Sequence, residues 1–284
     1  MSTITVKSLS KTYHHSKQAL SSVNLTIESG RIYGLLGRNG AGKTTLCNII
    51  GNRIFASRGT VELNGKPLCE NDELLKSVYC MGAEDLLPNY MRVRDVIRSM
   101  RMFYPKTDAD YAKKLCERFR LDPVKRLSQL STGYRTIAKV IFAMSSGAVF
   151  LFLDEPTLGL DANHRELLYQ LILERFEETG AAFVISTHLI DECAGLFEHC
   201  FILRNGSLIA DTDSDELRRL AYTVDGKAED VEAYLSGKEV LSRTAVGTLC
   251  SACVKGEPDA VPAGLNLSQP SMQQLLIALT GGEG

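Results

Sequence analysis

Short apolar runs bounded by turn residues alternate along the chain with longer segments of helical period. The apolar runs predict strands at Val23–Ile27, Ile32–Leu36, Val149–Leu153, Ala182–Ser186 and Phe201–Leu203. The helical periodicity predicts helices at Lys43–Ile50, Val93–Tyr104, Asp108–Phe119, Thr132–Met144, Arg165–Phe176 and Leu189–Phe197. This alternation of short strands and helices is typical of an α/β fold with a mainly parallel sheet.

Two segments depart from this alternation. Between Leu87 and Ser131 the signals are helical without a strong strand, which predicts a helical insertion at about residues 87–131. After about Ala210 the chain becomes charged and is then interrupted by glycines and prolines at short intervals. We therefore expect a main unit over residues 1–210 and a small separate module over residues 211–284. The first ten residues alternate apolar and polar side chains like an edge strand.

Composition and charge narrow the class of protein. The chain has 284 residues, 44% of them apolar and 23% charged, as in ordinary folded proteins. Its formal net charge of -2 argues against dedicated binding of nucleic acid. The longest uncharged stretch, Val140–Leu153, is shorter than the roughly 20 residues that a membrane-spanning helix needs. With no charged-then-apolar leader visible, we expect a cytoplasmic protein.

The eight cysteines are scattered, so we expect reduced thiols rather than a disulfide framework. Cys250 and Cys253 form a CxxC pair, but a four-ligand zinc site needs a second pair at suitable spacing. Neither Cys193 nor Cys200 with His199 offers that spacing. A metal or redox role for the CxxC pair is therefore the lesser alternative.

A phosphate-binding motif follows the predicted strand Ile32–Leu36 and opens the next predicted helix. It matches GxxxxGK[ST], the Walker A pattern, and an ordinary glycine-rich turn is the alternative. Glycines allow the backbone N–H groups to wrap around phosphate oxygens, while Lys43 reaches the β and γ phosphates and the Thr44 hydroxyl ligates Mg²⁺. The motif predicts nucleotide contacts from Gly37, Arg38, Asn39, Gly40, Ala41, Gly42, Lys43, Thr44 and Thr45.

Two adjacent carboxylates end the apolar run Val149–Leu153. Open α/β sheets bind ligands at the carboxyl ends of their strands, so both acids are expected at a ligand site. We expect Asp154 to hold Mg²⁺ and Glu155 to orient and deprotonate the attacking water. Taken alone, the pair is equally well explained as a plain strand terminus, and the phosphate-binding motif favours the catalytic interpretation.

Further motifs complete a family pattern. Leu130-Ser131-Thr132-Gly133-Tyr134 opens a predicted helix with Ser131 as its N-cap, and His188 follows the strand Ala182–Ser186. With Glu155-Pro156-Thr157 and Gly159-Leu160-Asp161, these residues resemble the ATP-binding subunits of ABC transporters over about residues 1–210. The resemblance implies a P-loop NTPase cassette with a mainly parallel core sheet, an antiparallel edge subdomain and a helical insertion. Residues 211–284 would then form a small C-terminal α+β appendage.

The resemblance also implies roles for individual residues. Tyr13 would stack on adenine, although a core aromatic at a strand end is the alternative. Ser131 and Gly133 would close on the γ-phosphate of ATP held by a second subunit, with Asp161 at the dimer seam. His188 would contact the γ-phosphate and, with Lys43 and Glu155, serve catalysis. The implied cofactors are ATP and Mg²⁺. The implied partners are a second ATPase subunit and a membrane permease. The protein would then lie at the cytoplasmic face of the plasma membrane.

The chain also departs from the family pattern. The segment Val78–Leu87 lacks the usual glutamine, so Glu84 is the candidate for its place near the metal, and Ala83 fits equally well by spacing. The Gly-Leu-Asp form and a glutamate in that loop resemble exporter-type subunits with a separate permease, including peptide and antibiotic export systems. An importer subunit is the main alternative. A non-transport ABC ATPase is disfavoured by the single P-loop, and a small-molecule kinase leaves Leu130–Gly133 and His188 unexplained.

Overall fold

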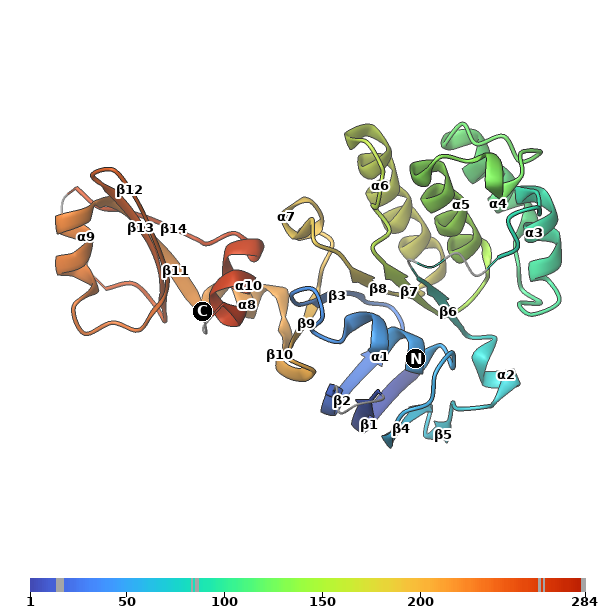
Figure 1. Cartoon of the computed structure of the whole chain (residues 1–284), viewed down its shortest axis with the longest axis horizontal. Coiled ribbons are helices and arrows are strands. Elements are labelled where there is room, and N and C mark those ends of the chain that lie inside the picture. Colours follow the sequence, from blue (N-terminus) through green and yellow to red (C-terminus); the bar gives the residue numbers. More distant parts are fainter. Residues whose placement is uncertain (14–17, 83, 85–86, 260–261, 263, 282–284) are drawn as a thin grey trace.

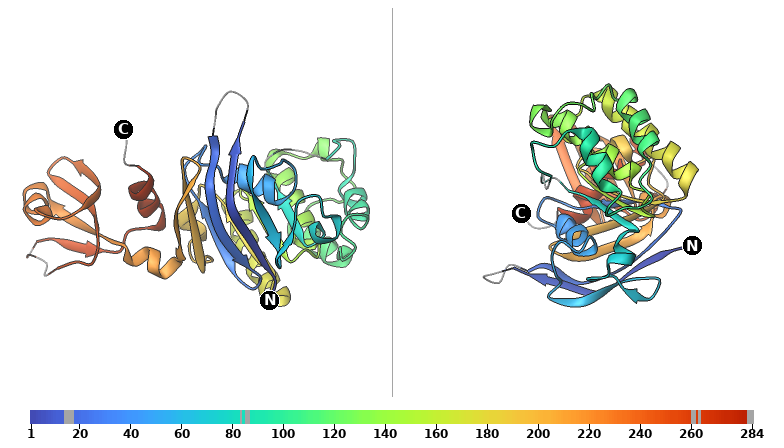
Figure 2. Two further views of the ribbon diagram at one scale, coloured as in Figure 1. Left: turned by 90° about the horizontal axis from the view of Figure 1, so that it is seen from below. Right: turned by 90° about the vertical axis from the view of Figure 1, so that its right-hand side faces the viewer.

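The computed structural model describes residues 1–13, 18–82, 84, 87–259, 262 and 264–281. Figure 1 shows a central body, a group of helices at one end of the long axis and a small sheet at the other end. Figure 2 shows the same order of parts from below and from the side of the helical end. No helix in the described part of the chain has the length and apolarity needed to span a membrane.

A six-stranded sheet forms the centre of the body, in the order β10-β9-β3-β8-β7-β6. All neighbouring pairs are parallel except β9 and β10. The strands are β3 Ile32–Leu36, β6 Val78–Met81, β7 Phe150–Asp154, β8 Ala182–Ser186, β9 His199–Arg204 and β10 Ser207–Asp213. The α/β fold with a mainly parallel sheet is confirmed, and its inner strands β3, β7 and β8 are mostly apolar and buried along their whole length, as expected for strands covered on both faces.

A second, antiparallel sheet has the order β2-β1-β4-β5. Its strands are β1 Thr3–Thr12, β2 Gln18–Glu28, β4 Arg58–Leu63 and β5 Lys66–Pro67. The expected edge strand at the start of the chain is wrong in one respect, because β1 pairs with β2 on one side and β4 on the other. The alternation of apolar and polar residues shows that one face of the strand is buried. An inner strand and an edge strand of a sheet with one buried face have the same alternation, so the pattern does not show how many neighbours the strand has.

The side chains of the core sheet divide into two apolar cores. In β3, Ile32 and Leu36 pack with the helices on one face, whereas Tyr33 and Leu35 pack with the antiparallel sheet on the other. Helix α1 (Lys43–Ile50) joins the second core through Leu46. Figure 1 shows α3 to α6 on one side of the core sheet and α1 with β1, β2 and β4 on the opposite side. The parallel strands are thereby sealed from water on both faces.

Four helices cover the upper face of the core sheet in Figure 1. They are α3 Val93–Met100, α4 Ala109–Arg118, α5 Thr132–Ser145 and α6 Ala162–Thr179, and shorter helices lie at α2 Asp72–Leu75 and α7 Ile190–Cys193. Asp108 caps α4 by accepting a hydrogen bond from the Tyr111 amide at 2.8 Å. The helices predicted for these segments form at the expected places, but the one expected over Leu189–Phe197 is only one turn long.

The C-terminal part contains a separate four-stranded sheet, in the order β12-β13-β11-β14. Its elements are β11 Ala221–Lys227, α9 Ala228–Leu235, β12 Val240–Val246, β13 Leu249–Lys255 and β14 Asn266–Ser268. Before it, α8 (Ser214–Arg219) inserts Leu217 into the core of the main body. After it, α10 (Met272–Thr280) returns to that body. We call residues 221–268 the accessory sheet.

The CxxC pair lies within β13, and its two cysteines serve different cores. Cys250 packs against α9 with Tyr222, whereas Cys253 packs on the other side with Leu275 of α10. Residues three apart in a strand face opposite sides of the sheet, so these thiols do not share a ligand site. All eight cysteines are free thiols, and no group of metal-ligating side chains occurs in the described residues.

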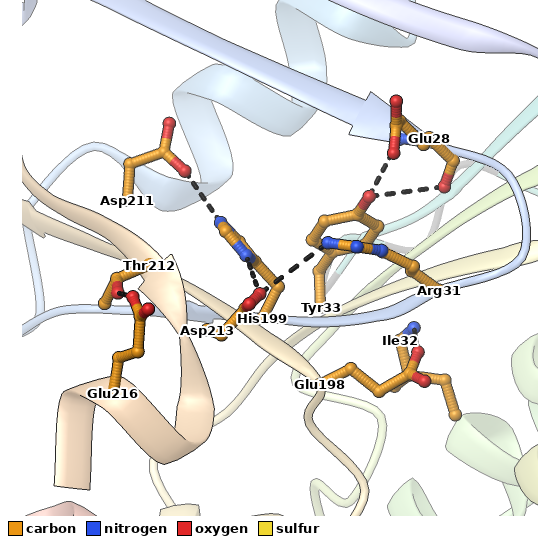
Figure 3. A network of polar contacts seen from close by, with 10 residues as sticks. All are labelled: Glu28, Arg31, Ile32, Tyr33, Glu198, His199, Asp211, Thr212, Asp213 and Glu216. Atoms are coloured by element: carbon orange, nitrogen blue, oxygen red, sulfur yellow. Dashed lines mark hydrogen bonds and ion pairs between the residues drawn. The ribbon is translucent and has the colours of Figure 1, made fainter. Parts of the chain in front are cut away.

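A polar network marks the edge of the body from which the C-terminal part departs (Figure 3). His199 bridges two carboxylates of β10, with Nε2 2.7 Å from Asp211 Oδ1 and Nδ1 2.8 Å from Asp213 Oδ1. The Arg31 guanidinium lies 3.6 Å from Asp213 Oδ1. These charges fix the end of β10 just before α8 begins.

Candidate functional site

The phosphate-binding motif forms a loop between β3 and α1, as its sequence predicts. Gly42 has a φ of +110°, and a Cβ at this position would lie 2.6 Å from the Ala19 carbonyl oxygen. Only glycine accommodates both the left-handed backbone and this close approach. The loop therefore reaches α1 with its backbone pressed against β2.

The Lys43 side chain turns back into the loop formed by the residues that precede it. Its Nζ atom donates hydrogen bonds to the carbonyl oxygens of Gly37 at 2.6 Å and Arg38 at 3.3 Å. Burial lowers the pKa of the Lys43 ammonium, while the nearby Glu155 and Asp154 carboxylates act in the opposite direction. The buried Lys43 ammonium is thus held at the centre of the loop, where a bound phosphate would replace the carbonyl oxygens as its partner.

Thr44 and Asp154 meet although 110 residues separate them in the sequence. The Thr44 hydroxyl donates a hydrogen bond to Asp154 Oδ2 at 2.7 Å. Asp154 is buried at the end of β7, and Thr44 lies in the first turn of α1. Both contribute hard oxygen atoms, the donor type that Mg²⁺ prefers, and the hydrogen bond shows that these oxygens converge on one point. The residues present therefore fit a Mg²⁺ site.

Glu155 and His188 also lie together. His188 Nδ1 is 2.7 Å from Glu155 Oε2, and the Glu155 amide donates a hydrogen bond to the Ser186 carbonyl oxygen at 2.8 Å. Glu155 has a φ of +52°, a conformation that costs a non-glycine residue energy and that concentrates at functional sites. The ends of the neighbouring strands β7 and β8 thus place a carboxylate and an imidazole in contact beside the loop.

A cavity of about 790 Å³ lies over the loop. One wall is formed by Gly37–Ala41 and Lys43, and a second by Thr187 and His188. A third wall comes from Gln273, Leu276, Ile277 and Thr280 of α10, which the sequence analysis did not associate with this site. The only sequence signal for that wall is the polar and β-branched stripe on an otherwise apolar helix.

Tyr13 lies at the end of β1, next to the helix that follows the loop. Its hydroxyl is 3.4 Å from Thr45 Oγ1, and the Lys11 ammonium lies 5.2 Å from the centre of its ring. The residue is 41% exposed, so it is not a core aromatic. An exposed ring beside α1 offers a stacking surface for a planar base, and its contact with adenine stays a prediction.

Ser131 and Gly133 open α5, where Ser131 Oγ accepts a hydrogen bond from the Tyr134 amide at 3.3 Å. Neither Ser131 nor Gly133 is among the described residues that line the cavity over the loop. Gly133 instead packs against the segment before α6, because a Cβ there would lie 2.4 Å from the Gly159 carbonyl oxygen. Asp161 caps α6 by accepting a hydrogen bond from the His164 amide at 2.9 Å. Their predicted contacts with a second subunit stay predictions.

Glu84 lies apart from the cavity over the loop. It lines a small cavity of about 70 Å³ between the core sheet and the helical insertion, together with Arg53 and Leu127. Its carbonyl oxygen accepts a hydrogen bond from Lys139 Nζ at 3.1 Å. Ala83, the alternative by spacing, lies outside the described residues. A role for Glu84 near Mg²⁺ stays a prediction.

Comparisons with known proteins identify the family. The model of the ABC transporter family matches residues 20–158. The ATP-binding protein YtrB of Bacillus subtilis is 31% identical over 201 residues, which cover 71% of this chain and 69% of YtrB. The chain belongs to the ABC transporter family, as an ATP-binding subunit. Family members of this kind couple ATP hydrolysis to transport, so the chain is an ATPase.

Two further comparisons extend this assignment. The arabinose import ATP-binding protein AraG of Ralstonia nicotianae is 29% identical, with a match that covers 76% of this ABC subunit and 45% of AraG. A solved dimeric structure of the ATP-binding cassette MJ0796, bound to ADP and Pi, superposes with a TM-score of 0.66 at 24% identity. It covers 74% of this chain and 98% of MJ0796, and confirms the P-loop ABC cassette fold.

Proposed function

We propose that this ABC subunit binds ATP at the Gly37–Thr45 loop and hydrolyses it between two copies of the ATPase. The observation that carries the proposal is the 2.7 Å contact of Glu155 with His188, which lines the cavity over that loop. A carboxylate in this place accepts the proton of an attacking water, and the adjacent imidazole holds the carboxylate in position. The MJ0796 dimer with ADP and Pi supports a dimeric site of this kind.

The residues around the loop divide the work of phosphoryl transfer. Lys43 supplies positive charge to the β and γ phosphates, and loop amides donate hydrogen bonds to their oxygens. Thr44 and Asp154 would hold Mg²⁺, which neutralises developing charge on the phosphates when bound. Ser131 and Gly133 of the second copy would approach the γ-phosphate from the opposite side, with Asp161 at the seam. Tyr13 would stack on the adenine.

Transport requires a membrane partner, and subunits of this family pair with membrane permeases. We propose that the chain attaches to the cytoplasmic face of the plasma membrane through a separate permease that exports a peptide, an antibiotic or another hydrophobic cargo. The Gly159-Leu160-Asp161 form supports export, while the similarity to the import protein AraG favours the alternative of import. Co-purification of the permease, followed by transport assays in vesicles of both orientations, distinguishes the two directions.

The organisation of the chain fits this proposal. We propose that residues 1–210 form the ATPase cassette, with a helical insertion at about residues 87–131, and that residues 211–284 form an accessory module. The separate core of the accessory sheet supports the division. The contribution of α8 and α10 to the main core shows how closely the two parts are joined.

Replacing Glu155 with glutamine tests the hydrolytic mechanism. Glu155→Gln keeps the size of the side chain but removes the base, so steady-state ATP turnover should fall by roughly two orders of magnitude or more. ATP binding, measured by titration calorimetry, should persist. Glu177→Gln, an exposed substitution on α6, is the control and should leave turnover unchanged. Full turnover in the Glu155 variant would refute its assigned role.

A further inference from the structure

Helix α10 has two buried faces that belong to different cores. Met272 and Leu276 lie in the core of the cassette with the helices that cover its parallel sheet. Leu275 and Ala278 pack instead against the accessory sheet. The helix therefore joins the two parts of the chain, and neither part moves relative to the other without disturbing one of its apolar faces.

Two hydrogen bonds fix α10 beside the catalytic residues. The Gln273 amide donates to Asp191 Oδ1 at 3.0 Å, and Asp191 is three residues beyond His188. Near the other end of the helix, Arg204 Nη1 donates to the Leu279 carbonyl oxygen at 3.1 Å. Arg204 is the last residue of β9, and Asp191 lies in α7, a few residues after β8 ends. The helix is thus held at the carboxyl edge of the sheet, where the nucleotide loop also lies.

The third face of α10 looks into the cavity over the nucleotide loop. Gln273, Ile277 and Thr280 follow one another at helical spacing and line this cavity opposite Gly37–Ala41. Ile277 is 55% exposed, although it lies in the middle of a helix whose other apolar side chains are mostly buried. The cavity thus has an apolar, solvent-facing residue on one wall and the phosphate-binding backbone on the other.

We propose that this face of α10, whose exposed side chains are Gln273 and Ile277, is a contact surface for the second ATPase subunit. The inference rests on the proposed function, in which Ser131 and Gly133 of a second copy approach the γ-phosphate over the same loop. The cavity that receives them is bounded by α10, so a copy that reaches the phosphate lies against Ile277. Its burial removes apolar surface from water and stabilises the closed dimer.

The same geometry connects the accessory sheet to the nucleotide cycle. A partner that presses on Ile277 acts on a helix whose opposite side is buried against β11 and β13. ATP-driven closure of the dimer would therefore transmit force through α10 to the part of the accessory sheet that packs against it.

Ile277→Asp in the Glu155→Gln background tests the contact surface, because slow hydrolysis preserves the ATP-bound state. Sedimentation velocity with Mg-ATP should show dimerisation weakened about tenfold or more, as expected for loss of one buried aliphatic contact. The loss should exceed any change in the ATP affinity of the single subunit. Leu249→Asp is the matched control, because Leu249 is 61% exposed on the accessory sheet and does not line this cavity.

The outcomes separate the two proposals. If the Glu155→Gln protein itself does not dimerise with ATP, the proposed function fails. If it dimerises and Ile277→Asp forms a dimer as tight as that of Leu249→Asp, or a tighter one, the α10 contact is overturned. Hydrogen exchange on the protein with Ile277 intact gives a second measurement. Amides of residues 273–280 should exchange more slowly with ATP only above the dimerisation concentration, and equal exchange above and below it would contradict the proposal.

Discussion

Gly133 has no room for a side chain, and this offers a sharp test of how α5 is held against the segment before α6. A Cβ at Gly133 would lie 2.4 Å from the Gly159 carbonyl oxygen, whereas ordinary contacts begin at 3.4 Å. Gly133→Ala therefore requires a shift of about 1 Å between the two backbones. Neither side yields easily, because Gly159 has a φ of +75° and the Thr136 hydroxyl ties α5 to the Leu158 carbonyl oxygen at 2.8 Å.

The cost of this overlap is that of overpacking a rigid contact, about 1–3 kcal/mol of unfolding free energy. For a chain of this size, each kcal/mol lowers the melting temperature by about 2–4 °C. Differential scanning calorimetry of the purified protein measures the change. Gly195→Ala is the matched control, because a Cβ at Gly195 would meet no atom within 4 Å. It should melt close to the unmodified protein.

Equal melting temperatures for Gly133→Ala and Gly195→Ala would refute this reasoning, since they would show that the gap accepts a methyl group without strain. The contact also changes how substitutions at Gly133 are interpreted. An acidic residue there would displace the Gly159 segment of the same subunit as well as repel a phosphate. A loss of ATP-dependent dimerisation in Gly133→Asp therefore has two causes.

Two further predictions concern charged groups. Lys43→Ala should weaken ATP binding at least about tenfold by titration calorimetry, because the exposed Arg38 side chain, the other cation of the loop, does not replace the buried Lys43 ammonium, and an unchanged affinity would contradict the assigned phosphate contact. Asp213→Asn concerns acid stability: the hydrogen bond from His199 lowers the pKa of Asp213 below its ordinary value of 3.8, so the stabilising effect of the ionised carboxylate is present above that pH and is lost as the pH falls through the folded pKa. Urea unfolding should thus show the unmodified protein as the more stable at pH 6, with the two proteins converging as the pH falls through the lowered pKa of Asp213; a constant difference would exclude the ionised carboxylate as the cause.

The chemistry of the nucleotide loop was predictable from the sequence because its parts are contiguous. Lys43 and Thr44 follow the glycines of one turn, and a strand that ends in two acids is recognisable from its apolar run. The strands Ile32–Leu36 and Ala182–Ser186 form within the bounds that their apolar runs predicted, because burial on both faces leaves no polar position inside them. Local sequence carries this information directly.

Other features depend on which distant segments meet. The pattern of β1 shows one buried face but not its two neighbours, and the spacing of Cys250 and Cys253 does not reveal that a strand sends them to opposite cores. The contact of Gly133 with Gly159 likewise requires that α5 and the segment before α6 lie together. Such proximity is a property of packing, which periodicity and composition do not encode residue by residue.

The sequence by itself determined several strands and helices of the cassette, the nucleotide loop and the acids that serve it, because each depends on the chemistry of a few consecutive residues. Only the tertiary structure decided that Thr44 reaches Asp154, that His188 meets Glu155 and that α10 forms a wall of the ATP cavity. The apolar residues of α10 predict a buried helix but leave open which core receives it. Here two cores divide its buried faces between them, and Ile277 is left facing the nucleotide loop.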